Sequence, residues 1–295
     1  LTSFPLLDVS SGTDFSYTWA YCYGLTSFPQ LNVSNSSYFS GAWRRCTSLT
    51  SFPLLDVSSG TDFSYTWSYC SSLTSFPLLD VSSGTNFSFA WVNLTDLTSF
   101  PLLDVSSGTN FSVAWAYCGS LTSFPLLDVS SGTNFTATWA GCSSLTSFPL
   151  LDVSSCIGFS DAWANCSSLT SFPLLNVSSG EIFEFSWYNC SSLTSFPALD
   201  FSSAIDLHQA WQNCTNLTTF PAGVFDTCPA TEYNAAWLNC ALDQQSVDNI
   251  LTSIDTAGQS NGRVGIFGGT SSPPGPAGLA AKANLIAKGW TVTTN

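Results

Sequence analysis

The chain has 295 residues, a formal net charge of −14 and only 8% charged residues, against about 25% in a typical globular domain. Hydrophobic residues make up 44% and aromatic residues 15%, which excludes an intrinsically disordered chain and allows a large core. The excess of acids disfavours binding to nucleic acid or to an anionic membrane, and no apolar run approaches the roughly 20 residues that membrane insertion requires.

A 24-residue repeat dominates the sequence. The phrase Leu-Thr-Ser-Phe-Pro first occurs at Leu1 and returns every 24 residues up to Leu193, and Leu217 begins a variant, Leu-Thr-Thr-Phe-Pro. Residues 1–240 therefore form ten repeats, of which the tenth is slightly longer. A fixed period of this length is typical of a solenoid, in which each repeat buries its apolar face against its neighbours.

The first half of each repeat predicts a short strand. In the repeat that begins at Leu121, residues 121–124 are prone to β-structure and end at Pro125, which cannot donate a ladder hydrogen bond. Residues 127–129 then alternate apolar, polar and apolar, like a second extended piece. We expect the strands of successive repeats to pair in parallel.

The second half predicts a short helix. Residues 132–134, Gly-Thr-Asn, form a turn and a helix cap. Phe135, Trp139 and Cys142 follow at the i, i+4 and i+7 spacing of one helical face. The fold class that we expect is thus an α/β solenoid with a leucine-rich-repeat-like parallel sheet, short helical turns and a helical C-terminal cap.

One Trp recurs in every repeat, and two interpretations of it compete. An aromatic stripe on the surface would bind sugars, whereas a stacked ladder would fill the core. The core is favoured because Trp shares its face with Phe and Cys. The predicted core residues are Trp19, Trp43, Trp67, Trp91, Trp115, Trp139, Trp163, Trp187, Trp211 and Trp237.

Nine of the eleven cysteines occupy one repeat position, where Leu94 stands in the fourth repeat. A leucine there indicates an apolar slot, so buried thiols are favoured over a series of disulfides. The remaining two, Cys156 and Cys228, lie at or near the Gly turn. The nine are Cys22, Cys46, Cys70, Cys118, Cys142, Cys166, Cys190, Cys214 and Cys240.

An acidic residue also recurs, and here two interpretations remain open. Stacked carboxylates repel one another, so either calcium bridges them or the Ser residues that follow bond them in Asx-turns. Asn32 and Asn176 occupy two of these positions, which fits the turn better. The acids are Asp8, Asp56, Asp80, Asp104, Asp128, Asp152 and Asp200. No other cofactor is expected.

Residues 241–295 differ from the repeats and predict a C-terminal cap. Residues 247–254 and 279–288 form two helices, the second ending at Gly289, while residues 265–267 and 290–292 form two strands. A solenoid needs such atypical end units to close its apolar end. No cap is visible at the N-terminus, so we expect missing upstream sequence and self-association through that uncapped end.

The repeats resemble a known family. The segment Phe183-Glu-Phe-Ser-Trp187-Tyr-Asn-Cys190-Ser-Ser-Leu193-Thr-Ser-Phe196 is similar to the BspA-like leucine-rich repeats of bacterial surface proteins and related viral ones. The resemblance covers residues 1–240. It implies an extracellular adhesin or attachment protein on a cell or virion surface.

Two functions fit the sequence. The first is a binding protein whose solenoid surface contacts a cell-surface protein or glycan; the second is a structural spacer or fibre component of a virion tail or cell-surface filament. No nucleophile–base pair, phosphate loop or metal cluster is visible, and His208 is the single histidine, so we expect no enzyme. The candidate binding face comprises Ser51, Ser75, Ser99, Ser123 and Ser147 with Tyr17, Tyr65 and Tyr69.

Overall fold

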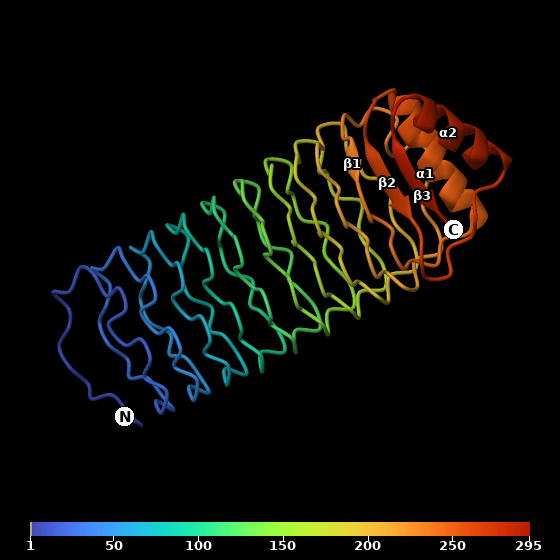
Figure 1. Cartoon of the computed structure of the whole chain (residues 1–295). Helices are drawn as coiled ribbons and strands as arrows, with labels where there is room; N and C mark the ends of the chain where they lie inside the picture. The colour runs from blue at the N-terminus through green and yellow to red at the C-terminus, as the bar shows by residue number, and fades with distance from the viewer. Residues whose placement is uncertain (1) are drawn as a thin grey trace. The chain divides into compact units, whose positions relative to one another are not determined.

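A computed structural model describes residues 2–295 of the chain. The chain forms two compact units, Leu1–Leu145 and Thr146–Asn295. Within each unit, consecutive 24-residue repeats, here called coils, are joined by backbone hydrogen bonds and parallel bridges. All regular helices and strands of the described residues lie at the C-terminal end of the second unit, as Figure 1 shows.

The prediction of a helix in each coil is wrong. The residues in question, 64–69 in the third coil, are a run of turns, which we call the turn segment. In the third coil, Tyr65 and Tyr69 have φ values of 58° and 62°, in the left-handed region that an α-helix excludes. The amide of Thr66 donates to the carbonyl of Phe63 three residues back, at 3.2 Å. The segment is therefore wound by local three-residue bonds.

Alternate amides of the same segment bond to the next coil. The amides of Tyr65, Trp67 and Tyr69 donate to the carbonyls of Ser88, Ala90 and Val92 at 2.9, 2.9 and 2.8 Å. This alternation satisfies the backbone without a helix and leaves Phe and Trp pointing into the core. The apolar spacing that indicated a helical face is shared by this turn segment, which explains the error.

The strand predicted at the start of each coil is also wrong as a regular element. There the coils are linked by single bonds, such as that from the amide of Thr50 to the carbonyl of Thr26. The recurring parallel bridges lie mostly elsewhere, at the position just before the inward-facing Phe. Examples are Asp62 with Asn86 and Asn86 with Asn110. Pro in each Leu-Thr-Ser-Phe-Pro segment removes the donor that a longer ladder needs.

Aromatic rings fill the core. The structure places all ten repeat Trp side chains there, none more than 2% exposed. In the first unit, the Trp67 ring stacks on those of Trp43 and Trp91 with centroids 6.1 and 5.7 Å apart, and the edges of Phe52 and Phe76 meet it. These indoles do not reach solvent, so they lie in the core as a stacked ladder and do not form a sugar-binding stripe on the surface.

The C-terminal sheet continues the parallel pairing of the last coils. Its strands are β1 (Glu232–Tyr233), β2 (Arg263–Ile266) and β3 (Thr291–Thr294), in the order β1-β2-β3 and all parallel. Asp206 bridges to Glu232, so β1 takes over from the preceding coil. The strands predicted at residues 265–267 and 290–292 are confirmed, each shifted by one or two residues at its ends.

Both C-terminal helices are confirmed. Helix α1 (Gln244–Ala257) begins where the Asp243 carboxylate accepts from the amide of Ser246 at 2.7 Å, and ends at Gly258 in the left-handed conformation. Helix α2 (Pro276–Ala287) packs beside α1 next to the sheet (Figure 1). The inner face of α1 is buried and includes Val247 and Ile250. The boundary between repeats and cap at residue 240 stays a prediction.

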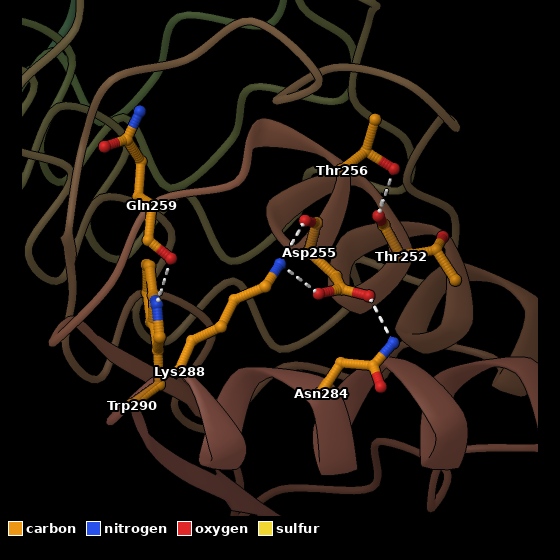
Figure 2. Close-up of polar contacts among 7 residues, drawn as sticks. All are labelled: Thr252, Asp255, Thr256, Gln259, Asn284, Lys288 and Trp290. Carbon is orange, nitrogen blue, oxygen red and sulfur yellow. Dashed lines mark hydrogen bonds and ion pairs between the residues drawn. The ribbon is translucent and has the colours of Figure 1, made fainter.

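Asp255 ties the two helices together (Figure 2). Its carboxylate accepts from Lys288 Nζ at 2.7 Å and from Asn284 Nδ2 at 2.8 Å, while its carbonyl also accepts from Lys288. Trp290 Nε1 donates to the carbonyl of Gln259 at 2.9 Å beside them. These bonds hold α2 and the start of β3 against the end of α1.

Candidate surface site

The predicted serines form an exposed row of hydroxyls. We call Ser51, Ser75, Ser99 and Ser123 of the first unit the Ser row; all four are exposed, as is Ser147 of the second unit. Their hydroxyls donate no hydrogen bond within residues 2–295. The neighbouring Thr50 hydroxyl instead donates to the carbonyl of Thr26 at 3.4 Å. The hydroxyls of the Ser row are thus available to a partner.

The predicted tyrosines lie apart from the Ser row, on the turn segment of each coil. Tyr17 is 48% exposed, whereas Tyr65 and Tyr69 are half-buried. The ring of Tyr65 stacks on that of Phe89 in the next coil with centroids 4.5 Å apart. The structure therefore gives two surfaces, one of hydroxyls and one of aromatic rings, where the sequence suggested a single face.

An exposed apolar row went unnoticed in the sequence. We call Leu54, Leu78, Leu102 and Leu126 of the first unit the Leu row; each is 61–65% exposed. Leu150 and Leu174 hold the same repeat position in the second unit, with 63% exposure. The sequence did contain a sign of this exposure. Each leucine of the Leu row follows Pro and precedes a second Leu, and two adjacent side chains of an extended chain cannot both point inward.

The recurring acids form Asx-turns. The Asp128 carboxylate accepts from the amide of Ser130 at 3.1 Å and from its hydroxyl at 2.7 Å. The hydroxyl and then the amide lower the pKa of Asp128. Asp56, Asp80 and Asp104 make the same pair of bonds. The Asx-turn interpretation is confirmed, and it accounts for one oxygen of each carboxylate without a cation.

A second polar position caps the turn segment. The Asn110 side-chain oxygen accepts from the amide of Ser112 at 3.1 Å, and Asp62 and Asn86 do the same for Ser64 and Ser88. The cap predicted at this position exists, but it caps a turn. Across residues 2–295, no three His, Cys, Asp or Glu residues are grouped as metal ligands would be.

The cysteines line the core beside the Trp ladder. Cys70 Sγ donates to the carbonyl of Trp43 in the preceding coil at 3.1 Å, and Cys118 Sγ donates to that of Trp91 at 3.3 Å. Both are free thiols, and Leu94 is buried at the equivalent position. Burial raises the pKa of Cys118 to about 12. These thiols are packing groups that also bond the backbone of the neighbouring coil.

His208 lies half-buried in the ninth coil, where its ring meets that of Phe185 edge-on with the ring centroids 5.7 Å apart.

Neither helix of the part of the chain that the structure describes is long and apolar enough to cross a bilayer. A scan against protein-family models matches no family, and a search of curated proteins finds no relative of this chain.

Proposed function

We propose that this chain is a non-enzymatic attachment protein on the outer surface of a cell or virion. Its coils form a leucine-rich-repeat-like solenoid that resembles the BspA-like proteins, and its exposed rows bind a cell-surface glycan or protein. Neither nucleic acid nor the interior of a membrane is a partner, since the repeats carry two basic residues against 16 acids.

The observation that carries the proposal is the Leu row. A leucine that stays more than 60% exposed at the same position of four successive coils gives the first unit a regular apolar strip on its surface. Contiguous exposed apolar surface of this kind is typical of interaction sites. A repetitive partner can engage several coils at once, so weak single contacts add through multivalency.

A second function, a spacer or fibre component, is favoured by the regularity of the core. Stacked Trp rings and inter-coil hydrogen bonds recur with little change from coil to coil. A spacer needs this regular interior but has no use for exposed leucines. The Leu row therefore favours attachment over the spacer.

The test compares two sets of serines. We expect the purified chain, labelled with a fluorophore, to be retained on whole cells or on a glycan array. Replacing the four residues of the Ser row by Ala should lower retention at least several-fold, because it removes one unbonded hydroxyl from each of four successive coils. The measurement is bound fluorescence against protein concentration.

The matched control replaces four serines that are also exposed but lie next to the Gly turn: Ser59, Ser83, Ser107 and Ser131. Their replacement by Ala should leave retention unchanged. If both sets of replacements lower retention equally, attachment through the Ser row is wrong. If wild-type protein binds no surface, attachment is wrong and the spacer remains.

A further inference from the structure

The first unit carries a cluster of arginine and tyrosine side chains on its turn segments. Arg44 in the second coil lies between two rings, with its guanidinium carbon 5.8 Å from the centre of the Tyr21 ring and 5.1 Å from that of Tyr65. Arg45 lies 4.6 Å from the centre of the Tyr69 ring. We call these five residues the Arg–Tyr cluster.

A glycine shapes this cluster. Gly41 has a φ of 60° and lacks the side chain that the other coils place at this turn. The ring of Tyr17 therefore lies over the Gly41 backbone, where an added Cβ would come within 2.5 Å of the ring. Tyr17 and Tyr21 remain 48% and 47% exposed. Two exposed Tyr side chains thus accompany Arg44 and Arg45, which are both half-buried.

The two arginines have no acid to neutralise them. They are the sole Lys or Arg residues of the ten repeats, which hold 16 acids. Within residues 2–295 the one ion pair joins Lys288 to Asp255, and Nε of Arg44 is buried without a hydrogen-bond partner. Burying part of the Arg44 guanidinium without a partner costs free energy, and both arginines lack an anionic partner within the described residues.

The chemistry of the cluster selects a class of ligand. A planar guanidinium fork matches a carboxylate bidentately. Exposed Tyr rings add a large amphipathic contact at low entropic cost. A long polyanion is repelled by the surrounding acids, so the ligand carries few charges.

We propose that the Arg–Tyr cluster, together with Tyr17, is a binding site for a carboxylate-bearing sugar, in which Arg44 and Arg45 bind the carboxylate and Tyr17 and Tyr21 contact the sugar ring. This inference rests on the proposed attachment function, for which it names the ligand class and the site. Tyr and Arg are also the residues that most often dominate binding energy at interfaces.

The experiment uses the full chain and four probes in titration calorimetry: tetragalacturonate, its methyl ester, sialyllactose and lactose. The chain should bind at least one acidic probe about tenfold or more tightly than its neutral counterpart. R44Q and R45Q should each weaken that binding about tenfold, a difference of about 1.4 kcal/mol. R44K should fall between wild type and R44Q, because Lys keeps the charge but loses the planar fork.

The matched control is Y117A. The Tyr117 ring is 53% exposed and lies over Gly141 as the Tyr17 ring lies over Gly41, but no arginine accompanies it. Y117A should bind the acidic probe as wild type does, and unchanged thermal unfolding should show that each variant is folded. Equal binding of acidic and neutral probes, no binding at millimolar concentration, or full binding by R44Q and R45Q would overturn the site.

The outcomes separate the site from the proposed function. If the R44Q/R45Q double variant adheres to cells as wild type does, attachment stands and the site for acidic sugars is wrong. If the wild type binds an acidic probe but no cell, the site stands and attachment is wrong.

Discussion

The buried thiols make stability depend on alkaline pH. Burial raises the pKa of Cys118 and of Cys240 to about 12 each, from a usual value near 9. An unfolded chain releases these protons near pH 9, whereas the folded chain holds them up to about pH 12. The contribution is therefore fully present below pH 9 and is lost as the pH rises from 9 to 12.

We expect the urea midpoint of unfolding to fall as the pH rises from 9 to 11, and C118A to show a shallower fall than wild type over the same range. The difference between the two proteins isolates Cys118, because every other titratable group is common to both. Parallel curves for the two proteins would show that Cys118 ionises in the folded state as it does in the unfolded one.

Trp67 tests the weight of the aromatic ladder. It is fully buried between Trp43 and Trp91, so W67A should lower the free energy of unfolding by about 3–5 kcal/mol, as large core truncations do. Its Nε1 has no hydrogen-bond partner within residues 2–295, so W67F should cost well under half as much. Chemical denaturation measures both; a W67A loss below about 1 kcal/mol would make the ladder peripheral.

At the scale of the element, the turn segment is the feature that separates this chain from a repeat with helices. Ala137 has a φ of 52°, whereas Ala140, three residues on, is buried and outside the left-handed region. A left-handed conformation costs a non-glycine residue about 1–2 kcal/mol, and a glycine in a helix costs about 1 kcal/mol relative to alanine.

A137G should therefore leave the free energy of unfolding unchanged or raise it by up to about 1 kcal/mol, while A140G should lower it. Urea denaturation of the two variants provides the comparison. A loss of about 1 kcal/mol in A137G, equal to that in A140G, would indicate a helix in this segment.

The sequence held evidence for the turn that the apolar spacing masked. Asn93, Gly141 and Asn165 occupy one repeat position, and glycine and asparagine tolerate a positive φ better than other residues. The aromatic and β-branched residues of the segment are also weaker helix formers than Ala or Leu. In α1, by contrast, the apolar spacing coincides with an Asp cap and a terminal Gly, and there the predicted helix is confirmed.

At the scale of the whole molecule, the 24-residue repeat could be predicted from the sequence, and so could the residues that make up its core. The period follows from the residues that recur every 24 positions, and burial follows because Trp and Cys are apolar side chains that favour the core. The path of the backbone was not readable, because bonds between coils fix it and any apolar face with the same spacing allows more than one path. Exposure of the Leu row follows from that path.

Attachment through an exposed face is the central claim, and replacement of the Leu row tests it most directly. Changing Leu54, Leu78, Leu102 and Leu126 to Thr should alter the free energy of unfolding by at most about 0.5 kcal/mol per site, as exposed substitutions do. Binding of the purified variant to whole cells should fall at least tenfold, while a cooperative thermal unfolding transition shows that the variant is folded. Cell binding equal to that of wild type in a folded variant would contradict the account.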